Sequence, residues 1–435
     1  MSTDKKFIYF PSFSSKASIL KKDDFKLGDL ETIRFYDDKY PEKFRHKFFL
    51  LTAGAFYKQK ANTRESLGMQ DTFILGDSGG FQIASGAIKY LGEPVAFQEQ
   101  IRETIFNWLE NNSDLAMNLD IPPKIKLAGE YETALKYSIE NFKYFEKKQT
   151  GKTKFLNVLQ MGNALETYDK WYHATKDFEF KGWGIGGTTK QYYNAIYVMA
   201  MFLKNRELEK KNIEYLHFLG TTSPFNFLIY AAFQKNLNKY YPHCVITTDS
   251  STPLMQGVYG NWYHSLNYNK LNWKQLYFGN KGKTKYLENQ KLPCALNCPV
   301  CQNITFGEIA NYKVLSEYML YVGWHNLAVF NKGLDEMSDL IYSHQDGGVL
   351  EIMFPKDILS LLKSIDDMFA NPDDAINIFS RNEKNYQKLS NLMTLSTDKA
   401  LLNSNLFTSD DEVIDEEDVE DRDTELAEIK KFEIG

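Results

Sequence analysis

Two aspartates lie in turns where a carboxylate could carry out glycosyl transfer. Asp77 lies in the segment 76–82 (GDSGGFQ), and Asp249 lies in 247–253 (TTDSSTP). A carboxylate flanked by hydroxyls can be held ionised and oriented, as a nucleophile at an anomeric carbon must be. In retaining glycosyl transfer a second carboxyl group moves the protons. Asp249 is therefore the candidate nucleophile and Asp77 the candidate partner, although Asp249 could instead be a helix N-cap in a Ser/Thr-rich turn.

Further polar and glycine residues have the chemistry of a base-binding pocket. Phe81 offers a flat face for stacking, Asp120 and Gln160 supply a carboxylate and an amide, and the glycine pair 186–187 lets a ligand approach the backbone. Carboxylates accept hydrogen bonds from ring N–H and exocyclic amino groups, so this set suits a purine. The competing interpretation is that Asp and Gly are common wherever a turn begins.

These residues must be positioned by the elements that precede them, which are short apolar runs. Seven runs are typical of buried strands, and long amphipathic stretches such as 131–148 and 191–211 separate several of them. FIYF (7–10) supplies an eighth. This alternation predicts an α/β fold, a (β/α)8 TIM barrel, in which the C-terminal ends of the strands converge on one rim. The seven runs are FFLLTAG (48–54), FILGDSG (73–79), LAMNLD (115–120), FLNVLQ (155–160), GWGIGG (182–187), YLHFLG (215–220) and VITTD (245–249).

Three clustered cysteines indicate a metal site. Cys294, Cys298 and Cys301 fall within eight residues and are followed by His325. Three thiolates and one imidazole complete a tetrahedral shell, which predicts a structural Zn²⁺ with no position left for a catalytic water. The alternative is three buried free cysteines and an unrelated histidine. The fourth cysteine, Cys244, is interpreted as a small buried residue.

Four regions are expected from these patterns. They are a barrel domain (1–290), an inserted zinc-binding subdomain (291–330), a helical C-terminal region (331–405) and an acidic, disordered tail (406–435). The sequence has neither a signal-peptide pattern at its start nor a run of about 18 apolar residues, so we expect no secretion and no membrane span. Four cysteines in 435 residues also indicate a reducing compartment rather than a disulfide scaffold.

The net charge of −6 comes from the acidic tail. Residues 410–428 hold twelve carboxylates and one arginine, so the rest of the chain has 50 basic and 45 acidic side chains, a net charge of +5. The segment 270–291 holds six lysines and interleaved aromatics, which could contact phosphates and bases. The alternative interpretation is a solvent-exposed, lysine-rich segment whose aromatic residues belong to the core. The lysines predicted to bind nucleic acid are Lys281, Lys283 and Lys285.

Taken in order, these motifs resemble the tRNA-guanine transglycosylase superfamily over about residues 48–330. The matching segments are 77–82 (DSGGFQ), 158–162 (VLQMG), 184–187 (GIGG), 215–220 (YLHFLG), and Asp249 with Pro253, followed by the cysteine cluster and 325–327 (HNL). The resemblance implies a TIM barrel with a zinc subdomain that exchanges guanine in a polynucleotide for a 7-deazaguanine, with retention and without an organic cofactor.

Residue by residue, the resemblance also implies roles. Asp249 would be the nucleophile and Asp77 the general acid/base, and Phe81 would stack on the base while His217 takes the place of a methionine that closes its other face. The remaining base-binding positions would be Asp120, Gln160 and Gly187, and the zinc ligands would be Cys294, Cys298, Cys301 and His325.

Several departures bear on which polymer is the substrate. The first cysteine gap is three residues where bacterial members have one, and segment 253–260 (PLMQGVYG) lacks the arginines that grip an anticodon loop in the tRNA enzymes. The chain therefore most resembles the DNA-directed, DpdA-type enzymes of phages and some bacteria, which implies a cytoplasmic location in a bacterial or phage-infected cell. A second copy of the chain or accessory DNA-modification proteins are the candidate protein partners. The alternatives are a tRNA enzyme and a non-catalytic nucleic-acid-binding paralogue.

Overall fold

The structure is a computed structural model of the 435-residue chain. Only the backbone is described at Val258, 276–277, 317–319 and 391–402; the other described residues include their side chains. The described residues are 5–12, 32, 34–59, 62–123, 130–188, 192–220, 223–277, 291, 294, 296–305, 307–308, 317–343 and 348–402. The tail predicted from residue 406 lies outside them.

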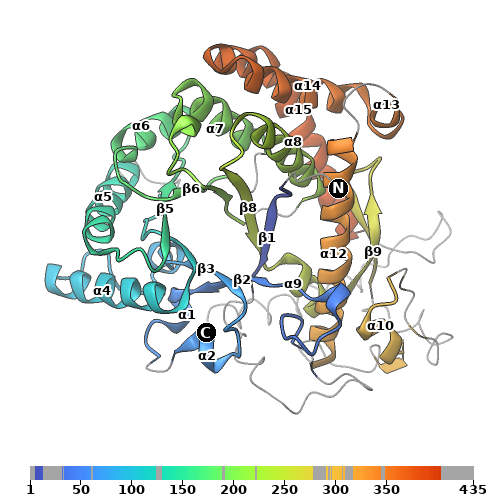
Figure 1. Ribbon diagram of the computed structural model, residues 1–435, viewed down its shortest axis with the longest axis horizontal. Coiled ribbons are helices and arrows are strands. Elements are labelled where there is room, and N and C mark those ends of the chain that lie inside the picture. The colour runs from blue at the N-terminus through green and yellow to red at the C-terminus, as the bar shows by residue number, and fades with distance from the viewer. Residues whose placement is uncertain are drawn as a thin grey trace.

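Eight parallel strands form one sheet that is nearly closed as a barrel, as predicted (Figure 1). The hydrogen-bonded order is β1-β8-β7-β6-β5-β4-β3-β2, and a parallel bridge from Ser12 to Leu50 links the two edge strands β1 and β2. Each strand corresponds to one of the eight apolar runs. Their bounds are β1 Ile8–Pro11, β2 Phe48–Thr52, β3 Phe73–Asp77, β4 Leu115–Met117, β5 Lys154–Leu159, β6 Gly182–Ile185, β7 Tyr215–Phe218 and β8 Val245–Ser250.

Most residues of the strands are apolar because the strands are covered on both faces. Side chains on one face of each strand fill the barrel, and those on the other face pack under the surrounding helices. All residues of β4 and β6 are buried, for example. This two-sided burial explains why the runs are continuous instead of alternating.

Helices follow the strands and cover the outside of the barrel (Figure 1). α8 shows how the sequence sets a helix start: the Ser223 hydroxyl accepts from the backbone N–H of Asn226, and Pro224 occupies the first turn, where a missing N–H costs nothing. The helices up to β8 are α1 Ala53–Phe56, α2 Thr63–Ser66, α3 Gly80–Ala84, α4 Val95–Asn112, α5 Glu130–Lys148, α6 Glu166–Thr175, α7 Tyr193–Lys204 and α8 Pro224–Tyr240, with short 3₁₀ turns η2 Glu42–Phe44 and η3 Glu207–Glu209.

Beyond the barrel, a β-hairpin and one long helix carry the cysteine region. The hairpin consists of β9 Asn261–Asn267 and β10 Asn272–Tyr277, which pair antiparallel. Helix α9 (Thr252–Val258) follows β8 in the chain, and α10 (Pro299–Asn303) comes after the hairpin. Helix α12 (Glu317–Ser343) packs against α9, α10 and β9. The expected boundary between the zinc-binding and helical regions, at residues 330 and 331, falls inside α12.

Helices α9 and α12 approach closely because glycines face each other at their crossing. A Cβ placed on Gly257 would lie 2.1 Å from the backbone nitrogen of Gly323, closer than van der Waals contact allows. Any larger residue at Gly257 would force the two backbones apart. Gly257 therefore fixes α12 against the helix that directly follows β8.

The C-terminal region is helical, as predicted, and packs on the outer wall of the barrel. It consists of α13 Val349–Met353, α14 Lys356–Ala370, the turn η5 Pro372–Asp374 and α15 Ala375–Leu402. Phe379 lies edge-on to Tyr197 of α7 at 5.2 Å between ring centroids, and Asp366 accepts from Asn236 of α8 at 2.7 Å. Among the described helices, none is both long and apolar enough to cross a membrane.

Candidate active site and metal centre

The predicted carboxylates come together at the C-terminal ends of the barrel strands. Asp77 is the last residue of β3, Asp249 lies near the end of β8, and Asp120 follows β4. The three lie close enough to interact electrostatically: after the larger effect of burial, the charge of Asp249 also raises the pKa of Asp77, and the charge of Asp77 also raises the pKa of Asp120. The strand ends thus bring together residues that are far apart in sequence.

Asp77 is held by donors from β2 and from its own turn. The Thr52 hydroxyl donates to Oδ2 at 2.8 Å, and the Gly79 backbone N–H donates to Oδ1 at 3.3 Å. Burial raises the pKa of Asp77, and these two hydrogen bonds oppose the rise. A carboxyl group whose pKa is raised by desolvation is suited to carry a proton. Sequence reasoning missed Thr52, which becomes visible only through its register opposite Asp77.

Asp249 is held by two donors on one oxygen. The Gly220 backbone N–H donates to Oδ1 at 2.7 Å, and Nε2 of His217 lies 3.2 Å from the same atom. Its side chain is 14% exposed, so the carboxylate is accessible at the barrel mouth. This arrangement matches what a nucleophile requires, which is a fixed, charged and accessible carboxylate.

His217 lies behind Asp249 in the barrel interior. The imidazole is fully buried, and its Nδ1 lies 2.9 Å from the Thr247 hydroxyl. Its ring is edge-on to Phe10 of β1. The predicted role of closing one face of a bound base stays a prediction, whereas the contact with Asp249 was not predicted.

Asp120 and Gln160 form a second polar pair on the same rim. The Gln160 side-chain N–H donates to Asp120 Oδ2 at 2.8 Å, and both side chains are buried. Burial, with a smaller contribution from Asp77, raises the pKa of Asp120 to about 7. Gly80 lets the Asp77 turn pack against this pair, because a Cβ there would lie 2.3 Å from the Asp120 carbonyl oxygen. The pair is pre-formed and can both donate and accept.

Phe81 and Gly187 lie at the edge of the same rim. Phe81 is 72% exposed at the start of α3, so the face of its ring is available to a ligand. Gly187 is exposed, and its carbonyl accepts from Asn194 at 2.7 Å. Both positions are accessible from solvent, so the expected contacts with a base remain open to test.

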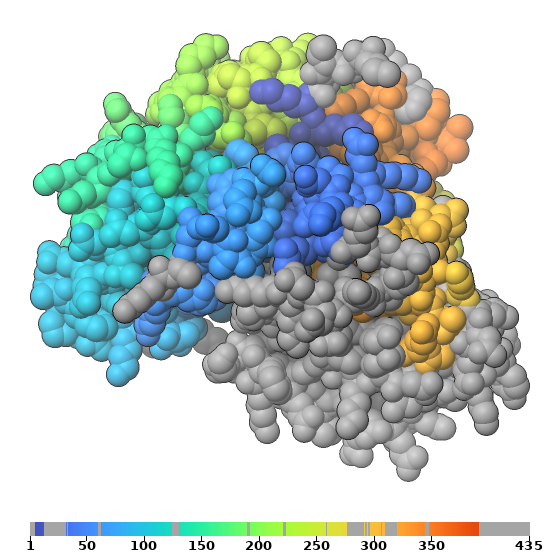
Figure 2. Space-filling view, turned by 60° about the horizontal axis from the view of Figure 1, so that its bottom comes forward, coloured from blue at the N-terminus to red at the C-terminus, as the bar shows by residue number. Residues whose placement is uncertain are grey.

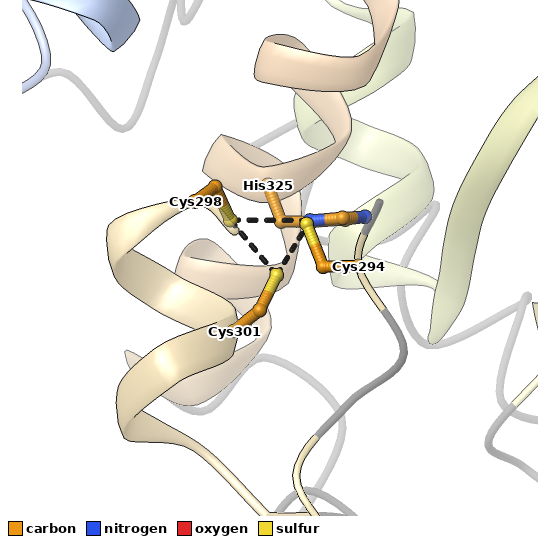
Figure 3. Close-up of side chains that lie close together, drawn as sticks. All are labelled: Cys294, Cys298, Cys301 and His325. Carbon is orange, nitrogen blue, oxygen red and sulfur yellow. Dashed lines mark hydrogen bonds between the residues drawn. The ribbon is translucent and has the colours of Figure 1, made fainter. Parts of the chain in front are cut away.

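The three cysteines and His325 form one cluster, as the sequence indicated (Figure 3). Their four possible ligand atoms lie within 4.8 Å of one another. The Cys298 and Cys301 sulfurs are 2.8 Å apart, and Nδ1 of His325 lies 3.0 Å from the Cys301 sulfur. Cys298 caps α10, Cys301 lies in α10, and His325 is on α12. The cluster is buried except for the half-buried Cys294, and it could bind a metal ion.

The surroundings of His325 fit the role of a metal ligand. Its Nε2 donates to the Tyr263 carbonyl at 2.6 Å, which leaves the lone pair of Nδ1 pointing to the sulfurs. The ring also stacks on Trp262 at 3.4 Å between centroids. A hydrogen bond on the far nitrogen is the usual way that proteins orient a metal-binding imidazole. The weak sequence argument for His325, which rested on spacing, is thus supported by geometry.

The neighbouring residue Asn326 joins the cysteine–histidine cluster to the start of α9. Its side-chain oxygen accepts from the Tyr263 N–H at 2.8 Å, and its amide donates to the carbonyls of Asn261 at 2.8 Å and of Pro253 at 3.2 Å. Pro253 follows Asp249 by four residues. One fully buried side chain therefore links α12, the hairpin and the start of α9.

The N-terminal part of the chain also lies beside the metal centre. Tyr40 is close enough to Cys298 and Cys301 that their charges raise its pKa, after the larger effect of burial. Phe35 lies near Trp324 of α12. Figure 2 shows this blue segment next to the amber residues of the cysteine region.

The lysine segment is only partly described. Lys281, Lys283 and Lys285 lie outside the described residues. Trp273 of β10 is stacked on Tyr263 and on Phe330, with ring centroids 5.1 and 5.3 Å apart, so this aromatic belongs to the core between the hairpin and α12.

In comparisons with known proteins, the chain matches no family model and no curated sequence. The resemblance to the guanine transglycosylases therefore remains an expectation drawn from the sequence motifs.

Proposed function

We propose that the protein is a transglycosylase that replaces guanine in DNA by a 7-deazaguanine. The observation that carries the proposal is the meeting of Asp77 and Asp249 at one rim, together with the Asp120–Gln160 pair. A desolvated carboxyl group beside a fixed, accessible carboxylate is the pairing that double displacement at a sugar carbon requires. The motif order supports guanine as the base, and the changed segment 253–260 favours DNA over tRNA.

In the first half-reaction an Asp249 oxygen bonds to C1′ of the target nucleoside, and the bond from C1′ to the base nitrogen breaks. Asp77 gives its proton to the departing guanine, which leaves as the neutral base. Burial of Asp77 favours this step, since it raises the pKa of the group that must hold the proton.

In the second half-reaction the incoming base returns the proton to Asp77. Its ring nitrogen bonds to C1′, and Asp249 leaves as a carboxylate. Two inversions give net retention. Asp120 and Gln160 would hold both bases by their polar edges, and Phe81 would stack on one face.

Exchange assays on three polymers test this function. We expect radiolabelled guanine to enter duplex or single-stranded DNA, and Asp249→Asn to abolish both exchange and a denaturant-stable enzyme–DNA adduct. Because asparagine has nearly the same shape as aspartate, loss of exchange in this variant would reflect the lost carboxylate and not a change in folding. Label entering tRNA alone would overturn the choice of polymer. Absence of exchange into all three polymers would overturn the function itself.

We further propose that the cluster holds one structural Zn²⁺. Three thiolates and one imidazole match the preferred ligands of zinc and fill a tetrahedral shell. The ion would then join α10 to α12 and, through Asn326, support the segment after Asp249. Metal analysis of the purified chain should give one zinc per chain, and a chain that folds without any metal would contradict this.

A further inference from the structure

The carboxylate of Asp249 has an asymmetric set of hydrogen bonds. Within the described part of the chain, both of its hydrogen bonds end on Oδ1, at 2.7 Å from the Gly220 nitrogen and 3.2 Å from Nε2 of His217. Because an ionised carboxylate oxygen can only accept hydrogen bonds, His217 Nε2 must carry a proton and donate it whenever Asp249 is ionised. Two donors on Oδ1 fix the rotation of the carboxylate about its Cβ–Cγ bond.

We propose that His217 is the positioning residue of Asp249, holding Oδ1 so that Oδ2 is the atom that attacks the sugar. This inference rests on the proposed function and names a residue that acts through Asp249. One donor alone would leave the carboxylate free to pivot about Oδ1. The second donor comes from β7 itself, whereas the first lies in the turn that follows β7, and together they remove that freedom before substrate binds.

His217 can serve this purpose because it is itself fixed. On the side away from Asp249, its Nδ1 is bonded to the Thr247 hydroxyl, and its ring lies edge-on to Phe10. His217 of β7 and Thr247 of β8 are register partners, and Asp249 lies two residues along β8 on the same face. The three side chains therefore form a row inside the barrel, from buried hydroxyl to accessible carboxylate.

Full burial argues that His217 does not itself exchange protons with solvent or substrate. The imidazole is 0% exposed, whereas the Asp249 side chain is 14% exposed. A substrate reaching the rim would meet Asp249 first. This burial distinguishes a positioning role from a role in direct proton transfer.

A spectroscopic experiment tests the contact without using the activity. The full chain is labelled with ¹⁵N in the rings of its seven histidines, and His217→Gln identifies the signals of His217 by their loss. Asp249→Asn should shift those same signals, because the acceptor of Nε2–H changes from a carboxylate to an amide. The half-buried His46, hydrogen-bonded to the Tyr9 carbonyl and to Asn331, is the internal control, and its signals should not shift. Unchanged His217 signals would overturn the proposal whatever the protein's activity.

Kinetics then test the consequence. His217→Leu, which removes the donor, should lower kcat by about ten- to a hundredfold, as loss of a hydrogen bond to a charged group predicts, with KM changed little. His217→Gln keeps an N–H donor and should recover most of kcat. His46→Gln removes a half-buried histidine elsewhere in the fold and controls for general destabilisation.

An equal decrease in kcat in the His217→Leu and His217→Gln variants, or a change confined to KM, would overturn the positioning role. If the wild-type chain exchanges no base, the proposed function fails, while the ring-signal shift still decides whether His217 holds Asp249. The two failures are therefore distinguishable.

Discussion

Replacing Asp120 by Asn should make the protein more stable, and by an amount that grows with pH. Burial raises the pKa of Asp120 from its ordinary 3.8 to about 7. In the unfolded chain the carboxyl group loses its proton near pH 4, whereas in the folded chain it keeps the proton up to about pH 7. The folded state thus binds more protons between these values, and stability falls as pH rises through this window.

The size of the stabilisation by Asp120→Asn follows from the shift in the pKa of Asp120. Asp120→Asn cannot ionise, so it lacks the cost of a buried charge, and its amide oxygen can still accept from Gln160. By linkage, this pKa shift makes the difference in free energy of unfolding between variant and wild type larger at pH 8 than at pH 5, by about 3 kcal/mol. Below about pH 3, where the carboxyl group is protonated in both states, wild type and variant should differ by the packing change alone.

Urea unfolding at pH 5, 6, 7 and 8, followed by tryptophan fluorescence, measures this difference. Subtracting wild type from variant at each pH cancels the titration of groups that both chains share. Asp71→Asn, at an exposed position, controls for the loss of one negative charge. A stability difference that stays constant from pH 5 to pH 8 would show that Asp120 does not titrate in this window and would refute the reasoning.

Three further predictions concern the proton carrier, the metal and the polymer. Asp77→Asn should lower kcat by about a hundredfold or more, because general acid–base catalysis contributes that much; exchange within about threefold of wild type would exclude Asp77 as the proton carrier. Cys298→Ser should lower the metal content and the urea midpoint together, and unchanged metal content would exclude Cys298 as a ligand. Changing three lysines to Ala should flatten the dependence of log Kd on log salt by up to about three phosphates' worth, and an unchanged slope would place the DNA contacts elsewhere; these are Lys281, Lys283 and Lys285.

The strands could be predicted from sequence because burial on both faces leaves a continuous apolar run for each. The clustering of the three cysteines with His325 as a candidate metal site could be predicted, because thiols within eight residues of one another have few other uses. The continuity of α12 across the expected boundary at residues 330 and 331 was not predicted, since the boundary was placed where one helix in fact continues.

The contacts of the site residues were also beyond sequence reasoning. The hydrogen bonds from Thr52 to Asp77 and from His217 to Asp249 depend on strand register, which brings together residues 25 and 32 positions apart. A histidine in an apolar run can face a ligand, a neighbour or the core, and only the three-dimensional arrangement distinguishes these. Trp273 illustrates the reverse case, because an aromatic that could have stacked on a base is packed in the core.

The pairing of β1 with β8 has a consequence for how the protein is made. Residues Ile8–Pro11 lie beside residues 247–250, with Phe10 opposite Asp249. Lys5 is likewise tied to the second half of the chain, since its ammonium donates to the Pro242 carbonyl and its own carbonyl accepts from Asn238 and Tyr342.

Strand β1 must therefore wait for β8, which lies about 240 residues further along the chain. At 5–20 residues per second, roughly 12–50 s pass between the synthesis of the two strands. During that time the edge of β1 that pairs with β8 has no partner, and this apolar segment is exposed to chaperones and to other nascent chains. Strand β8 gains its second neighbour only when this early segment pairs with it, so the rim that holds Asp249 is completed late, and a chain stalled before residue 250 would carry an open barrel edge.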